Sequence, residues 1–149
     1  MRKLVKGFFL LILAGWIVIQ FVPVDRTNPP VAGEITAHDE VMLVLRTSCY
    51  DCHSNETRWP WYSRVAPVSW WMAQHVRMGR ERLNFSEWQP LSPEEMEEAR
   101  KEAWEEVERG SMPLPVYLRM HPEALLTEPQ REALERWSQG REPGFPDWD

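Results

Sequence analysis

The pentapeptide CYDCH constrains this 149-residue chain more than any other feature, because it contains both cysteines and one of the four histidines. A disulfide between Cys49 and Cys52 would close a small, strained ring and stabilise the fold very little. A zinc site needs a second pair of closely spaced ligands, which the other three histidines do not form. A thioredoxin-like redox pair is expected after a strand in a βαβ pattern, and the flanking residues lack that pattern.

The remaining interpretation is covalent attachment of a c-type haem. Two thiols one helical turn apart can add to the two vinyl groups of the porphyrin, and the residue after the second cysteine then places its imidazole under the iron. The motif therefore predicts one haem c, attached to Cys49 and Cys52, with His53 as the proximal iron ligand.

The sixth ligand of such an iron has nine candidates: Met42, Met72, Met78, Met96, Met112, Met120, His38, His75 and His121. Three of the methionines lie at helical spacing among apolar residues, where methionine usually fills a core: Met42, Met72 and Met96. Met112 differs, because it lies in ERGSMPLPVY between a helix-ending glycine and two prolines that stiffen the chain. Met112 is the predicted distal ligand, and the alternatives are His75 or an open position.

The N-terminal segment, residues 1–22, is predicted to be a transmembrane signal anchor. From residue 7 to 22 only Gln20 interrupts an apolar run that approaches the roughly 20 residues needed to cross a bilayer. Three cations precede the run, which places the N-terminus in the cytoplasm by the positive-inside rule. No small-x-small cleavage site precedes Pro23, so an uncleaved anchor is favoured over a cleaved signal.

The rest of the chain is long enough for one domain. Residues 23–35 are polar and contain Pro and Gly, which predicts a tether; residues 36–140 are the predicted haem domain and 141–149 a C-terminal tail. Of the 17 Lys and Arg residues, three lie at positions 2, 3 and 6, so the remaining chain carries 14 basic against 23 acidic side chains. Nucleic acid is excluded as a partner, since phosphate binding needs a basic surface.

Apolar periodicity and capping patterns predict helices over residues 37–48, 67–79, 93–109 and 128–139. Their predicted N-caps are Thr36, Ser92 and Thr127, the last two with Glu95 and Gln130 as capping-box partners. No segment alternates between apolar and polar residues as a half-buried strand does. The predicted fold class is therefore all-α.

Three blocks in order carry a resemblance to a known family: CYDCHSNETRWPWYSRVAPVSWW, GRERLNFSEW and GSMPLPVYLRMHPEALLTEPQREALERWSQG. Their arrangement over residues 37–140 resembles a class I c-type cytochrome and, more narrowly, the small bacterial haem-binding domain family of membrane-tethered, cytochrome-c-like proteins. The resemblance implies thioether links at Cys49 and Cys52, iron ligation by His53 and Met112, and a crossing of the first and last helices of the haem domain.

Two further expectations concern the surroundings of the haem. A backbone carbonyl in the bend at residues 64–67 is expected to accept a hydrogen bond from the proximal imidazole. The haem propionates are expected to pair with side chains close to the motif, for which ordinary packing or solvent exposure is the alternative: Arg58, Trp59, Trp61, Tyr62 and Arg64.

The predicted function is one-electron transfer by a single-pass protein of the bacterial inner membrane, with the haem domain on the periplasmic side. Its expected partners are redox proteins, above all membrane respiratory components, and no enzymatic activity is expected. The alternatives are a peroxidase-like enzyme, a gas or redox sensor with an open distal position, or a haem subunit of a larger respiratory complex.

Overall fold

The computed structural model describes residues 1–141, and every regular element in that range is a helix. The elements are α1 (Arg2–Ile19), α2 (Asp39–Ser48), α3 (Tyr50–His53), η1 (Trp61–Arg64), α4 (Val68–Arg82), α5 (Pro93–Glu108), α6 (Pro115–Leu118), η2 (Pro122–Ala124) and α7 (Glu128–Ser138). The all-α prediction is thus confirmed, and within residues 1–141 extended pairing is limited to one parallel bridge between Gly33 and Glu87. Most of the predicted tail, residues 142–149, lies outside the described residues.

Helices α5 and α7 begin at the predicted residues and end one residue before their predicted ends. In α5 the Ser92 hydroxyl accepts a hydrogen bond from Glu95 N, and the Glu95 carboxylate accepts one from Ser92 N at 2.7 Å. The same reciprocal box joins Thr127 and Gln130 at the start of α7. The glycine two residues beyond each helix has a positive φ of 72° or 65°, which glycine adopts without steric cost.

The start of α2 differs from its prediction. The helix begins at Asp39 with His38 as N-cap, so the prediction of Thr36 in that position is wrong. The reason lies outside the local sequence, because Ile35 donates its backbone N–H to Phe85 O at 2.8 Å and buries its side chain. That pairing holds the chain extended until it has passed Thr36.

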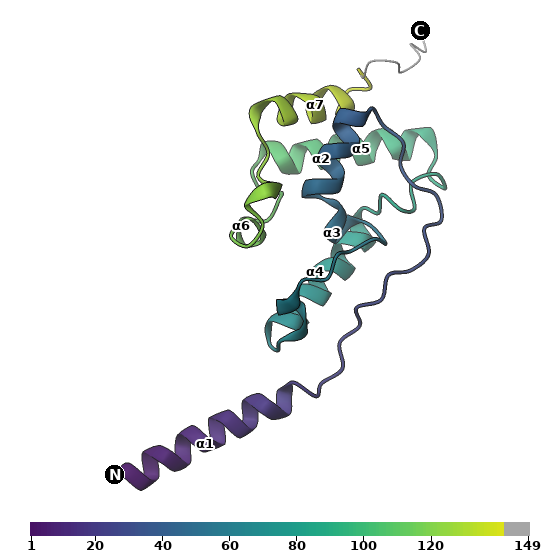
Figure 1. The fold of residues 1–149 in the computed structure, drawn as a ribbon. Helices are drawn as coiled ribbons and strands as arrows, with labels where there is room; N and C mark the ends of the chain where they lie inside the picture. Colours follow the sequence, from purple (N-terminus) through teal and green to yellow (C-terminus); the bar gives the residue numbers. More distant parts are fainter. Residues whose placement is uncertain (142–149) are drawn as a thin grey trace.

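The core lies around α7, which packs against both α2 and α5 (Figure 1). Val44 of α2 and Trp137 of α7 are both buried there, which confirms that the first and last helices of the domain pack against each other. Trp137 also lies 6.1 Å from Trp88, ring centroid to ring centroid. Burial of such large rings supplies much of the stability of a small core.

Helix α4 approaches α3 closely because residue 79 has no side chain. A Cβ atom added at Gly79 would lie 2.6 Å from the Cys52 carbonyl oxygen, well inside contact distance. This glycine therefore does not stop α4, which continues to Arg82, three residues beyond its predicted end. It allows the backbones of the two helices to meet.

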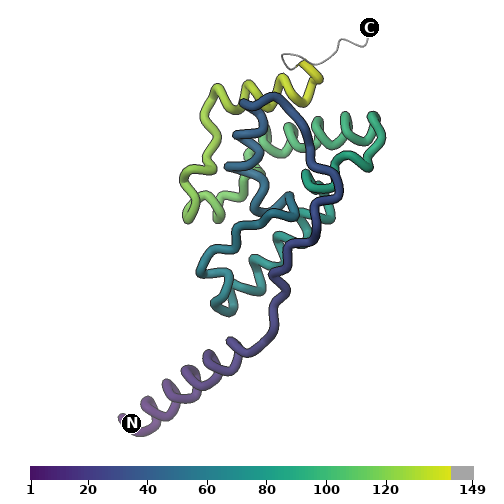
Figure 2. Tube along the Cα trace, turned by 45° about the vertical axis from the view of Figure 1, so that its right-hand side comes forward, coloured from purple at the N-terminus to yellow at the C-terminus, as the bar shows by residue number. Residues whose placement is uncertain are grey.

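Residues 23–35, the predicted tether, lie along the domain (Figure 2). Asn28 donates its side-chain amide to Thr57 O at 3.0 Å, and Gly33 N donates to Ser86 O at 3.0 Å. At the start of this segment, the Gln20 side chain exchanges two hydrogen bonds with the Ala66 backbone, at 2.9 and 3.2 Å. The segment is therefore attached to the domain at several points.

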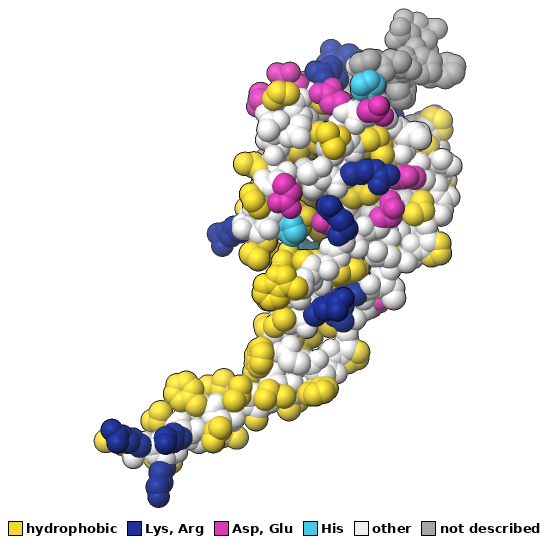
Figure 3. Space-filling model, viewed as in Figure 1, with side chains coloured by type: hydrophobic (Ala, Val, Ile, Leu, Met, Phe, Trp, Pro, Cys, Tyr) yellow, Lys and Arg dark blue, Asp and Glu magenta, His cyan; other side chains and the backbone are white. Residues whose placement is uncertain are grey.

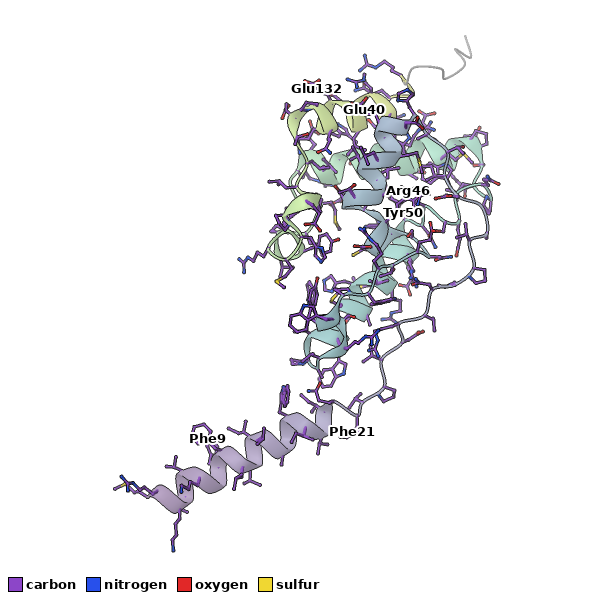
Figure 4. All side chains as sticks on the ribbon, viewed as in Figure 1. Phe9, Phe21, Glu40, Arg46, Tyr50 and Glu132 are labelled. Carbon is purple, nitrogen blue, oxygen red and sulfur yellow. The ribbon has the colours of Figure 1, made fainter. Side chains whose placement is uncertain are left out.

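Helix α1 projects from the domain, and its apolar side chains are exposed around it. Phe9 and Phe21, labelled in Figure 4, leave 65% and 81% of their surface exposed. Figure 3 shows the cations of this helix gathered at its free end. Within residues 1–141, no helix combines the length and apolarity of a membrane span.

The approach of α4 to α3 yields a first prediction. Gly79→Ala should lower the free energy of unfolding by about 1–3 kcal/mol, because the clash is with backbone and outweighs the helix propensity of alanine. Thermal unfolding followed by circular dichroism measures the effect. Gly7→Ala in α1, where an added Cβ has no neighbour within 4 Å, is the matched control. An unchanged or raised midpoint for Gly79→Ala would contradict the account of this contact.

Candidate functional site

The CYDCH motif forms the one-turn helix α3, which follows α2 without a loop. Cys49 is both the C-cap of α2 and the N-cap of α3. Its carbonyl accepts hydrogen bonds from Cys52 N at 3.1 Å and His53 N at 2.9 Å, the bonds of a single helical turn. The two thiols and the imidazole therefore leave the backbone within one turn, which is the spacing that two attachment points and a neighbouring ligand require.

The imidazole of His53 is held by a backbone carbonyl. Its Nδ1 lies 3.1 Å from Leu83 O, and because a carbonyl only accepts, Nδ1 carries the proton and Nε2 keeps its lone pair. The prediction of an acceptor within residues 64–67 is wrong. The acceptor comes from the far end of α4, where Leu83 is the extended C-cap residue and faces α3.

The segment after Leu83 completes this contact. Phe85 N donates to His53 O at 2.8 Å, and Ser86 Oγ accepts a hydrogen bond from Asn55 N at 2.9 Å. Asn84 donates its side-chain amide to Asn55 Oδ1 at 2.9 Å. Residues 83–86 thus form a polar support behind the motif and orient the imidazole.

Burial sets the charge state of the motif. It raises the pKa of the Cys49 thiol to about 12 and that of Cys52 to about 11, so both are protonated near neutral pH. It lowers the pKa of His53, which keeps the imidazole neutral and able to ligate a metal. No disulfide joins the two cysteines.

Two adjoining cavities open beside the motif, with volumes of about 280 and 550 Å³. Cys49, His53 and Met112 line both, and Cys52 lines the larger one. The structure thus brings Met112 beside a motif some 60 positions earlier in the chain. The combined space is within the range of small-molecule and cofactor sites.

The walls of the smaller cavity are mainly apolar and come from α2, α5, α7 and the segment after α4. They include Leu45, Phe85, Trp104, Val107, Leu134 and Trp137. Such a lining excludes water and suits a flat, apolar ring system with few polar groups.

Two other donors border the larger cavity from α4, His75 and Met78. His75 Nδ1 donates to Trp71 O at 2.8 Å, so its Nε2 also keeps a lone pair. Its ring lies 3.9 Å from that of Trp71, centroid to centroid. His75 therefore remains the alternative to Met112, and the structure adds Met78 beside it.

The remaining histidines lie elsewhere. His38 caps α2, and His121 Nε2 accepts a hydrogen bond from the Tyr62 hydroxyl at 2.5 Å. Neither lines either cavity. Among residues 1–141, no three His, Cys, Asp or Glu side chains cluster as a metal site.

The side chains expected to pair with haem propionates do not line the cavities. Arg58 donates to Asp51 Oδ1 at 3.1 Å, and Trp59 Nε1 donates to Asn28 Oδ1 at 3.3 Å. The arginine that lines both cavities is Arg82, which the sequence analysis missed. Its place on the cavity walls follows from the approach of α4 to α3 at Gly79, one helical turn earlier, which the local sequence does not signal.

Asp51, between the two cysteines, ties the motif to α6. Its carboxylate accepts hydrogen bonds from Arg58 Nε at 3.1 Å and from the Tyr117 hydroxyl at 2.8 Å. Burial, followed by the Asp51 charge, raises the pKa of Tyr117 well above its usual value, so the hydroxyl stays a donor. Tyr117 lines the larger cavity, and sequence analysis gave it no role.

Comparison with known proteins agrees with this geometry. A family model described as a haem-binding domain matches residues 14–140. Neither the curated proteins nor the solved structures include a match to the chain.

The contacts of Asp51 predict that removing its carboxylate destabilises the protein more than removing the Tyr117 hydroxyl does. Asp51→Ala should lower the free energy of unfolding by about 1–3 kcal/mol because it removes the acceptor of the Tyr117 hydroxyl and of three Arg58 donors, and Tyr117→Phe by about 0.5–1.5 kcal/mol. Denaturant unfolding of the unmodified protein, both single variants and the double variant gives a double-mutant cycle. The double variant should lose less than the sum of the single effects. Strict additivity would mean that Asp51 and Tyr117 do not stabilise the protein through a shared bond.

Proposed function

Because this chain belongs to the haem-binding domain family, we propose that it holds one haem c covalently and transfers single electrons. In this proposal Cys49 and Cys52 carry the thioether links, His53 is the proximal ligand and Met112 the distal ligand. The observation that carries it is the meeting of two neutral thiols, a neutral imidazole and a thioether on one largely apolar hollow.

The residues around the hollow fit a porphyrin. The Leu83 carbonyl fixes the imidazole plane and makes Nε2 more basic. The ring walls exclude water, which disfavours the additional charge of the oxidised metal and raises the reduction potential. Arg82, at the border of both cavities, is positioned to pair with a propionate in exchange for its 3.4 Å ion pair with Glu102.

When bound, the haem supplies an iron that changes oxidation state by one electron. A chain that offers an imidazole and a thioether to this iron leaves no position for a substrate, which favours an electron carrier over an enzyme. A displaceable distal ligand would instead favour the peroxidase-like or sensor alternative.

We further propose that α1 is the membrane anchor of a periplasmic domain in the bacterial inner membrane. Its exposed apolar side chains and the three cations at its start support this orientation. Covalent haem attachment takes place on the outer side of that membrane, which agrees with it. The expected partners are redox proteins, including membrane respiratory components, whose encounters the anchor confines to the membrane surface.

Covalent attachment is tested by cysteine substitution. Full-length protein produced with a haem-maturation system should stain for haem on a denaturing gel and keep its pigment in acidified acetone. Cys49→Ser and Cys52→Ser each remove one link, and the double variant should lose all retained pigment, since the chain has no other cysteine. Pigment retained by the double variant would refute thioether attachment.

The distal ligand is identified by three matched variants. Met112→Ala should abolish the sulfur-to-iron charge-transfer band of the ferric protein and lower the reduction potential. Met78→Ala and His75→Ala, which alter donors on the same cavity, should leave the band intact. If only Met78→Ala loses the band, the distal ligand is Met78 of α4 and not Met112.

The same variants separate carrier from enzyme. The unmodified protein should bind carbon monoxide slowly and turn over no peroxide, and Met112→Ala should bind carbon monoxide readily. Rapid binding or peroxide turnover by the unmodified protein would favour an open distal position.

A further inference from the structure

A second apolar hollow, of about 510 Å³, lies on the surface where η1, the start of α4 and α6 meet. We call it the aromatic groove, and its most exposed members are Trp61, Val68, Trp71, Val116 and Met120. Trp61 leaves 73% of its surface exposed. No part of the proposed haem site needs these side chains, and a contiguous exposed apolar patch typically marks a binding surface.

The aromatic groove adjoins the end of α1. The Gln20 side chain, at the end of that helix, bonds both backbone groups of Ala66, and the next residue, Pro67, lines the groove. Figure 3 shows apolar side chains continuing from α1 onto the adjoining part of the domain. The groove and the exposed face of α1 therefore form one continuous apolar surface.

The charge around the groove differs from that of the whole chain. Residues 57–80 and 110–122, which supply most of the groove, contain no Asp or Glu, although the chain has a formal charge of −6. Arg64 of η1 and Arg119, just after α6, lie within these segments. Arg64 and Arg119, close to the apolar rings, are complementary to an anionic lipid surface.

We infer that the aromatic groove docks on the lipid headgroup region of the membrane that holds α1. The inference rests on the anchoring role proposed above for α1. Tryptophan and tyrosine favour this interface because their rings are apolar and their N–H or O–H groups reach water. Arg64 and Arg119 meet the anionic headgroups.

Docking fixes the orientation of the haem site. Tyr117 lines both the aromatic groove and the larger cavity, and its hydroxyl bonds Asp51 inside the CYDCH motif. One side chain therefore separates the docked surface from the cavity. The cavity is held close to the membrane plane, where membrane-embedded redox partners exchange electrons.

Site-directed bimane labels test the docking in the full-length, haem-loaded protein. The labels are attached to Met120→Cys in the groove, Phe9→Cys in α1 and Glu132→Cys on α7, all exposed positions. Figure 4 places Glu132 at the end of the domain away from α1. Each protein is inserted as a single copy into nanodiscs of anionic lipid, with or without bromine on the upper acyl carbons. Comparing the two discs cancels quenching by the haem.

The expected result is strong bromine quenching at positions 9 and 120 and none at 132. If the label at position 9 is quenched but the label at position 120 is as little quenched as the label at position 132, the docking is overturned and the membrane anchor is retained. No quenching at 9 would overturn both. Trp61→Cys repeats the measurement at a second groove position, so a local effect of the Met120 substitution cannot decide the outcome.

The charge contribution is tested in the same discs. Arg64→Gln and Arg119→Gln should each lower the ratio of docked to undocked protein about fivefold, and zwitterionic lipid should act in the same direction. If bromine quenching at position 120 is unchanged by both arginine substitutions and by zwitterionic lipid, the electrostatic part of the docking is overturned. Discs that hold two copies of the protein provide a further comparison. If the label at position 120 is shielded from solvent only in these discs, a second chain covers the groove and the inference is overturned.

Discussion

The hydrogen bonds between His53 and residues 83–85 are the contacts on which the site depends. Leu83 O accepts the Nδ1–H at 3.1 Å, and Phe85 N donates to His53 O at 2.8 Å. Both require α4 to pass close to α3, which the missing side chain at Gly79 allows. The orientation of the imidazole is therefore a consequence of how two helices pack, since a looser packing would leave the ring without its acceptor.

A polar network extends this support to the segment that follows α1. Arg80 donates to Ser54 O at 2.8 Å, next to the motif, and to Thr27 O at 3.0 Å. Tyr50, within the motif, donates its hydroxyl to Glu34 at 3.0 Å, and the Arg46 guanidinium lies 4.9 Å from the centre of its ring (both residues are labelled in Figure 4). The chain between α1 and α2 is thereby fixed to the site. An anchor at α1 would consequently determine the distance of the proposed haem from the membrane.

The aromatic groove and the larger cavity share Tyr117, which links the proposed docking to the proposed redox site. Electron transfer between membrane proteins depends on how closely two cofactors approach. A docked domain presents its cavity at a fixed height, whereas a freely swinging domain would sample many orientations and pay an entropic cost at each encounter. The attached segment and the groove thus serve the same end.

The sequence by itself determined what depends on near neighbours along the chain. The CYDCH spacing, the capping boxes of α5 and α7 and the glycine stops follow from bonds within four or five residues. Tertiary structure decided the acceptor at Leu83, the late start of α2, and Arg82 and Tyr117 on the cavity walls. Each of these depends on segments about 30 or more residues apart, or on the face that a packed helix presents. Local propensities do not encode either property, because many helix arrangements satisfy the same local bonds.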